Sequence, residues 1–281
     1  MSNFSFSVLL ICLLCLLLTG IAQEVEDERE FDYIKGSEKG PERWGELKKE
    51  WKVCENGKMQ SPIDMSNRRV KIIAKMGDIK RKHKPCNATI KNRGHDIMLR
   101  WEGNGDAGSI EINGTQYYLQ QFHWHAPTEH SINGRRYALE LHMVHVDPKT
   151  NRTAVIGQLY KFGHPDHFLA KLGKSIRSIV DKEEEINIGR LDPREIKLGG
   201  SKIYRYMGSL TVPPCTEGVI WTINKKMGSV SHTQVKLLRD AVHDVSPQEH
   251  KIYARGKRKA IATRKMTDMS VSVIQDIKLK T

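Results

Sequence analysis

The spacing of histidines within residues 121–145 constrains the fold of this chain more than any other feature of its sequence. Side chains alternate between the two faces of a β-strand, so His123 and His125 share one face if they lie on a strand. The apolar, β-branched run at 138–145 follows an Asn-Gly turn signal and is predicted as a second strand. Antiparallel pairing of the two strands would bring His142 to the face that carries the first two imidazoles.

Three imidazoles that converge from two adjacent strands match the ligand set of a catalytic zinc site, in which water takes the fourth position. Gln121 and Glu140 are predicted to lie nearby, where each can accept the second ring N–H of a ligand and fix its tautomer. The alternative interpretation is a partly buried polar pair without metal. We interpret His130 and His145 as structural, because strand alternation turns His145 away from the face of His142.

These residues belong to an ordered set of motifs that resembles the α-class carbonic anhydrases, and Asn133-Gly134-Arg135-Arg136-Tyr137 is similar to the plant members. The resemblance extends from about Tyr33 to about Asp244. The matching motifs are His123-Trp124-His125, Glu129-His130, Glu140-Leu141-His142-Met143-Val144-His145, Gly40-Pro41-Glu42-Arg43-Trp44, Gln60-Ser61-Pro62-Ile63-Asp64, Lys91-Asn92-Arg93-Gly94-His95 and Gly208-Ser209-Leu210-Thr211-Val212-Pro213-Pro214-Cys215. Ordered motifs over most of the chain argue against a chance match.

The resemblance implies both a fold class and a reaction. The family fold is mostly β, with a large, mostly antiparallel central sheet and short peripheral helices. The implied function is zinc-dependent, reversible hydration of carbon dioxide to bicarbonate and a proton by attack of zinc-bound hydroxide. The chain would then be a carbonate dehydratase, a lyase, with Zn²⁺ as its cofactor and carbon dioxide and bicarbonate as its small-molecule partners.

Further site residues are carried over from the family pattern. Thr211 matches the gatekeeper that accepts the proton of the hydroxide while donating to a carboxylate, here Glu129. His95 matches the proton shuttle, a role that suits a side chain with a pKa near neutral pH. Many relatives have a second threonine where this chain has Val212. The family pattern places the apolar substrate pocket at Val144, Val155, Leu210, Val212, Val219 and Trp221, residues that could equally be ordinary core.

Residues 1–22 are predicted to be a cleaved signal peptide. The apolar run from Val8 to Leu18 is too short to span a bilayer, and Gly20 and Ala22 are small residues where a signal peptidase reads. An uncleaved hydrophobic N-terminus is the alternative, because no Lys or Arg precedes the run. We expect no membrane span after cleavage and a location in the secretory pathway, extracellular in the apoplast or in a plastid reached through that route.

Passage through the secretory pathway permits disulfides and gives Asn-x-Ser/Thr sequences meaning as glycosylation sites. The family resemblance implies a disulfide between Cys54 and Cys215. Cys86 is then the odd thiol, and the sequence leaves its fate open. The predicted glycosylation sites are Asn87, Asn113 and Asn151.

Residues 23–250 are predicted to form one catalytic domain, in which the acidic run at residues 24–30 is interpreted as a solvated leader. Short runs between Gly and Asn residues predict further strands at 97–101, 109–112, 116–119 and 154–160. One helix is predicted to start near Pro165 and to bury Phe168, Leu169, Leu172, Ile176 and Ile179. A second opens on a capping box at Ser231 and Gln234 and buries Val235, Leu238 and Val242.

Residues 251–281 are predicted to be a divergent basic tail. Relatives have an Asn-Ala-Arg-Pro stretch and a closing strand after the last helix, and only Ala254-Arg255 is similar here. In the family this region supplies a backbone carbonyl to the imidazole at the position of His125, so its divergence predicts weakened activity rather than none. More than half of the net charge of +13 lies beyond His250, and this tail could contact a polyanion.

Three hypotheses therefore remain. The first is a zinc enzyme. The second is a carbonic-anhydrase-like binding or storage protein with weak or no activity because of the divergent C-terminus. The third is an adhesion or polyanion-binding protein that uses the tail. No nucleic-acid partner is expected, because no reading module accompanies the charge. Retention of the three ligand histidines with Thr211, Glu129 and His95 favours the enzyme.

Overall fold

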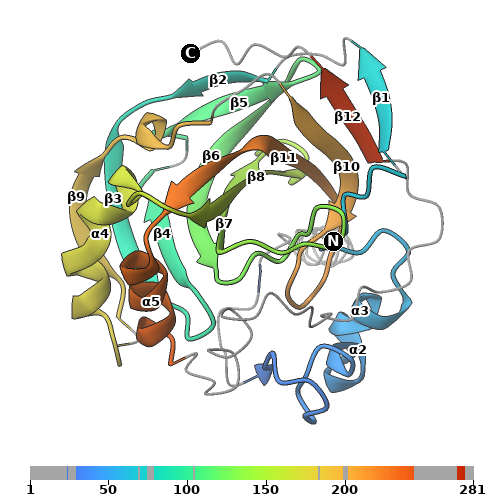
Figure 1. The fold of residues 1–281 in the computed structure, drawn as a ribbon, viewed down its shortest axis with the longest axis horizontal. Helices are drawn as coiled ribbons and strands as arrows, with labels where there is room; N and C mark the ends of the chain where they lie inside the picture. The colour runs from blue at the N-terminus through green and yellow to red at the C-terminus, as the bar shows by residue number, and fades with distance from the viewer. Residues whose placement is uncertain are drawn as a thin grey trace, which may run out of the picture.

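The computed structural model is built around one curved sheet of twelve strands that crosses the molecule (Figure 1). The structure describes residues 24, 30–68, 70–74, 79–103, 105–182, 184–198, 202–243 and 271–275. The strands are β1 (Val70–Ala74), β2 (Lys80–His83), β3 (Cys86–Asn92), β4 (Ile97–Trp101), β5 (Gly108–Ile112), β6 (Thr115–His125), β7 (Leu139–Val146), β8 (Thr153–Phe162), β9 (Ile186–Leu191), β10 (Ile203–Ser209), β11 (Glu217–Val230) and β12 (Val271–Gln275). Their order is β1-β12-β10-β11-β8-β7-β6-β4-β3-β9, with β5 paired to both β6 and β2.

Most neighbouring strands in this sheet run antiparallel, and the parallel pairs are β8 with β11 and β1 with β12. The predicted fold class, a large and mostly antiparallel sheet, is therefore confirmed. The predicted runs at 116–119 and 121–125 form a single strand, β6, whose pairing with β7 shifts register between Leu119 and Gln121. Beyond the shift, His123 lies directly opposite His142.

Strand alternation gives β6 and β7 two different faces. Phe122 and Trp124 enter the largest apolar cluster, whereas His123 and His125 point to the opposite face. Every residue of β7 except the last is buried, because both faces of this central strand are covered. His145 lies on the far side from His142, as predicted, where its Nε2 is 2.9 Å from Nε2 of His83.

Helices α4 (His167–Ser178) and α5 (His232–Ala241) lie side by side against one end of the sheet (Figure 1). Helix α4 begins where Asp166 caps it by accepting from the Leu169 N–H, and α5 has the predicted capping box. The predicted apolar residues of both helices are buried in the main cluster, apart from half-buried Val242. The ring of Phe168 packs 6.0 Å from that of Phe122, measured between centroids, so α4 supports the strand that carries two of the histidines.

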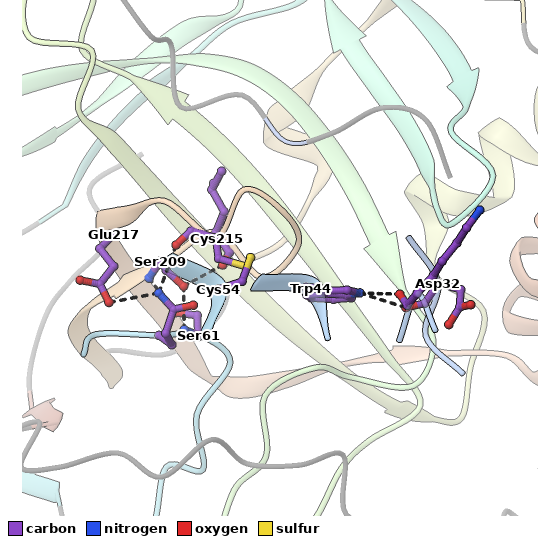
Figure 2. Close-up of a disulfide and its surroundings, with 10 residues drawn as sticks. Asp32, Trp44, Cys54, Ser61, Ser209, Cys215 and Glu217 are labelled. Atoms are coloured by element: carbon purple, nitrogen blue, oxygen red, sulfur yellow. Dashed lines mark hydrogen bonds between the residues drawn. A yellow bond between two sulfur atoms is a disulfide. The ribbon is translucent and has the colours of Figure 1, made fainter. Parts of the chain in front are cut away.

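Short helices precede the sheet at the other end of the molecule: α2 (Trp44–Leu47), the 3-10 helix η2 (Lys49–Trp51) and α3 (Val53–Asn56). A further 3-10 helix, η3 (Pro193–Glu195), follows β9. The predicted disulfide between Cys54 and Cys215 is present and joins α3 to the loop before β11 (Figure 2). Figure 2 also shows Trp44, whose indole N–H donates to the backbone oxygen of Asp32 at 3.2 Å.

Cys86 forms no disulfide, and its buried thiol donates to the Glu102 carbonyl at 3.2 Å. Strand β12, which pairs with β10 and β1, lies within the region predicted as a tail and was not expected from the sequence. The predicted signal peptide and the rest of that tail, including Ala254-Arg255, lie outside the described residues. No described helix is long and apolar enough to cross a membrane.

Candidate metal centre

The structure brings His123, His125 and His142 together on one face of β6 and β7. Nε2 of His123 lies 3.0 Å from Nδ1 of His142, and the ring centroids of the three histidines are 4.7–4.9 Å apart. All three are buried, and one nitrogen from each lies within 4.8 Å of the others. Such a cluster can hold a metal ion.

The second ring nitrogen of two of these histidines is held by an acceptor, as predicted from the spacing. Gln121 Oε1 lies 2.7 Å from Nδ1 of His123, and Glu140 Oε1 lies 3.0 Å from Nε2 of His142. Because both oxygens can only accept, each imidazole donates there and turns its other nitrogen towards the shared point. Nε2 of His125 is buried and has no hydrogen-bond partner among the described residues, which leaves it available to a metal.

Burial lowers the pKa of His123 and His125 well below the usual value, and a neutral imidazole is the form that binds a metal. Burial would also lower the pKa of His142, but the adjacent carboxylate of Glu140 outweighs it and raises that pKa. The donor set is therefore three buried nitrogens, two of them on rings held by an acceptor. This arrangement fits a zinc ion with three protein ligands.

Glu140 is held by a buried network that the sequence did not predict. Its carboxylate accepts from His130 through Nδ1 at 2.6 Å and through the backbone N–H at 2.9 Å. Nε2 of His130 lies 2.6 Å from the Tyr206 hydroxyl, which lies 2.9 Å from Ser61 Oγ. Burial would raise the pKa of Glu140, but His130 and His142 hold it well below the usual range. His130 is thus structural, as predicted, and its ring nitrogens are engaged in this network rather than free for a second metal.

Glu129 lies on the other side of the cluster, where its Oε2 is 3.5 Å from Nε2 of His125. Burial raises the pKa of this carboxyl to about 7, and the Thr211 side chain opposes the rise. However, neither Thr211 Oγ1 nor Glu129 Oε2 has a hydrogen bond of normal geometry within the described part of the chain. Donation from Thr211 to Glu129 therefore stays a prediction.

His95 lies in the turn between β3 and β4, and its position differs from the one expected for a proton shuttle. The side chain is only 4% exposed, and its ring lies 5.1 Å from that of Phe31. Burial lowers the pKa of His95, which moves it away from the neutral value that suits a shuttle. No local sequence pattern indicated that Phe31 covers His95, because the two residues are far apart along the chain.

Two charged residues flank His95, and sequence reasoning assigned them no role. The Arg93 guanidinium makes a bidentate ion pair with Asp96, with Nε at 2.7 Å and Nη2 at 2.5 Å from its oxygens. Its third nitrogen, Nη1, lies 2.9 Å from Oε2 of Glu24. The interpretation of residues 24–30 as a solvated leader is therefore wrong for Glu24, whose side chain is 9% exposed. This ion pair could have been predicted from the sequence, because Arg93 and Asp96 carry opposite charges and lie three positions apart.

The residues predicted as the substrate pocket are all buried. Five of them, Val144, Val155, Leu210, Val219 and Trp221, belong to one apolar cluster, and the Trp221 ring lies 4.8 Å from that of His142. Val212 instead packs in the neighbouring cluster that contains the disulfide. Of the predicted glycosylation sites, Asn87 and Asn113 are exposed and Asn151 is half-buried.

Comparisons with known proteins identify the family. Residues 39–266 match the model of the eukaryotic-type carbonic anhydrases. The chain is 58% identical over 222 residues to alpha carbonic anhydrase 7 of Arabidopsis thaliana, which covers 79% of this chain and 80% of the relative. It is 54% identical over 248 residues to carbonic anhydrase Nec1 of Nesocodon mauritianus, with 86% and 88% covered. Among solved structures, dioscorin complexed with ascorbate superposes with a TM-score of 0.78 at 39% identity, covering 89% of this chain and 99% of that one. The chain therefore belongs to the eukaryotic-type, α-class carbonic anhydrases, enzymes of the carbonate dehydratase type.

Proposed function

We propose that this protein is a zinc enzyme that reversibly hydrates carbon dioxide to bicarbonate and a proton. The observation that supports this proposal best is the convergence of three buried imidazoles, two of them oriented by Gln121 and Glu140, beside an apolar wall. A bound Zn²⁺ would supply the nucleophile by lowering the pKa of its water ligand to about 7. Three nitrogen donors, with one position left for water, are the ligand set that this chemistry requires.

The residues of the chain would divide the remaining tasks. His123, His125 and His142 would hold the metal, while Gln121 and Glu140 keep their rings in position. The cluster around Trp221 would provide a dry surface for the uncharged gas. Thr211, held by Glu129, would orient the nucleophile, and His95 would carry the released proton away from the site.

Stopped-flow carbon dioxide hydration, with zinc content measured on the same sample, tests the proposal. We expect the His123→Ala variant to lose both zinc and activity, because one of three metal-facing nitrogens is removed. His167→Ala is the matched control, since His167 is exposed on α4 and far from the cluster in sequence. Full activity in His123→Ala, or a wild-type protein that binds zinc without hydrating carbon dioxide, would refute the proposed function.

His95→Ala separates the proton-transfer role from metal binding. We expect bound zinc to be unchanged and the maximal rate to fall, with partial rescue by a small imidazole buffer. An unchanged rate in weak buffer would remove His95 from the mechanism. Because the His95 side chain is buried against Phe31, this variant also tests whether the buried position is compatible with proton transfer.

A second candidate is a ligand-binding or storage protein of the same fold. The similarity to dioscorin, a protein solved with ascorbate, is the observation in its favour. It is the weaker candidate, because such a role does not require three metal-facing nitrogens oriented by two acceptors. This candidate would be supported if the protein showed no hydration activity and bound ascorbate in isothermal titration calorimetry.

We also propose that the protein enters the secretory pathway, and the Cys54–Cys215 disulfide supports this location because such bonds form in oxidising compartments. Mass spectrometry of the protein secreted by plant cells would test cleavage after Ala22. A mobility shift on glycosidase treatment would test the exposed sites Asn87 and Asn113. Apart from residues 271–275, the basic tail that was predicted to contact a polyanion lies outside the described residues.

A further inference from the structure

A carboxylate of the chain itself lies beside the candidate metal centre. Oε2 of Glu24 is 2.9 Å from Nη1 of Arg93, and Oε1 is 3.8 Å from Nε2 of His123, the nitrogen that faces the metal position. Glu24 thus spans from a buried guanidinium to the metal-facing nitrogen of His123. Its position follows the predicted cleavage after Ala22, so it would remain in the processed protein.

Arg93 is built to present one N–H group to this position. Asp96 accepts from Nε and Nη2 in a bidentate pair, which fixes the plane of the guanidinium and balances its charge. The backbone N–H of Arg93 also donates to the Asp96 carbonyl at 2.9 Å, so the turn itself is closed. Both side chains are at most 2% exposed. Nη1 is therefore a buried, fixed donor that donates to Oε2 of Glu24.

A carboxylate and a bicarbonate ion share the planar O–C–O group and a single negative charge. A guanidinium N–H on one oxygen and a metal near the other is a common way to bind such an anion. We propose that Arg93 is an anion-recognition residue that binds bicarbonate or a small carboxylate beside His123, and that Glu24 occupies this place as an internal competitor. This inference rests on the proposed function for the identity of the natural anion.

The position of Glu24 argues for competition rather than for a purely structural ion pair. A structural partner of Arg93 needs only its charge, and Asp96 already supplies that. Glu24 instead reaches past Arg93 to within ion-pair distance of the metal-facing nitrogen of His123. Nε2 of the buried His95 lies 3.6 Å from Oδ2 of Asp96, and neither His95 ring nitrogen has a hydrogen-bond partner among the described residues.

Sodium acetate titrations of the Co²⁺-substituted protein test the proposal, because the visible spectrum of Co²⁺ reports a change of its ligands without measuring activity. The protein is secreted from the full chain, and its N-terminus is verified by mass spectrometry. We expect Glu24→Gln to bind acetate about tenfold more tightly than wild type, because no internal charge has to be displaced. Glu30→Gln is the matched control: it removes one charge from the half-buried pair with Lys48, at 2.7 Å, and should leave the acetate affinity unchanged.

A second set of variants tests Arg93. The double variant Arg93→Met with Asp96→Asn removes both buried charges together, and in the Glu24→Gln background it should abolish the gain in acetate affinity. Arg93→Lys provides the test if the double variant does not fold, because a lysine can pair with Asp96 but cannot also present a rigid second N–H. Calorimetric acetate titration of the metal-free proteins should give the same ranking with weaker binding.

Equal acetate affinities, within about twofold, for wild type and Glu24→Gln in both forms of the protein would overturn the proposal. Retention of the gain in the Arg93 variants would overturn the role of that residue. Sodium bicarbonate is titrated in parallel to test the natural anion. A wild-type protein that does not bind metal, or does not hydrate carbon dioxide, would instead refute the proposed function. In that case the titrations of the metal-free proteins still test anion binding by Arg93.

Discussion

The Glu140→Gln substitution should weaken zinc binding and lower the stability of the protein. Glu140 is completely buried and accepts three hydrogen bonds, two from His130 and one from His142, a candidate metal ligand. Glutamine has almost the same shape, but an NH₂ group replaces one oxygen. At least one of the three donors would then face another donor, and the charge that strengthens all three bonds would be lost.

The magnitude follows from this count. One buried donor left without a partner, together with weaker remaining bonds, should lower the free energy of unfolding by about 2–4 kcal/mol. A looser His142 ring should lower zinc affinity by roughly 10- to 100-fold, the range typical of residues that orient a metal ligand. Urea unfolding and competition with a zinc chelator measure the two effects separately.

Glu111→Gln is the control for the loss of one carboxylate, because Glu111 forms a surface ion pair with Lys80 at 2.9 Å on strands β5 and β2. We expect its zinc affinity to equal that of wild type. Zinc affinity in Glu140→Gln within about twofold of wild type would refute the reasoning, since it would mean that the orientation of His142 does not depend on Glu140.

Three further predictions concern stability. Replacing Cys54 and Cys215 by serine should lower the free energy of unfolding in urea by roughly 4–5 kcal/mol, because the disulfide closes a loop with a sequence separation of 161; a loss below about 1 kcal/mol would contradict this estimate. Gly208→Ala should destabilise the protein by about 1–3 kcal/mol and so lower the melting temperature, since a Cβ atom there would lie too close to Ser61 Oγ. An unchanged melting temperature would show that Ser61 can move to make room for the methyl group. Burial lowers the pKa of His145 to about 3 and that of His83 well below 6.5 in the folded protein. The unfolded chain therefore binds protons below pH 6.5 that the folded chain does not, so their contribution to stability is complete above pH 6.5 and is lost as the pH falls towards 3, by up to about 1.4 kcal/mol per pH unit for each histidine. Urea unfolding at several pH values gives the slope of the free energy of unfolding against pH. This slope should be shallower for His145→Gln than for wild type, and equal slopes would show that His145 does not contribute to the pH dependence.

Local patterns in the sequence predicted much of the fold. The two-residue period placed His123 and His125 on one face, and the same period turned His145 away from His142, because alternation is a property of the strand backbone. The capping box at Ser231 likewise fixed the start of α5 through contacts within four residues. The motifs identified the family, and with it the disulfide and the sheet.

The tertiary structure alone decided which groups surround the cluster. The contacts of Tyr206 with His130, of His83 with His145 and of Glu24 with Arg93 join residues that are distant along the chain. No periodicity or local motif encodes such pairs, because they depend on which strands become neighbours and on how loops cover the sheet. The burial of His95 has the same origin. The sequence thus determined the strands, their faces and the candidate ligands, whereas packing between distant segments determined the orientation, the electrostatics and the access of the site.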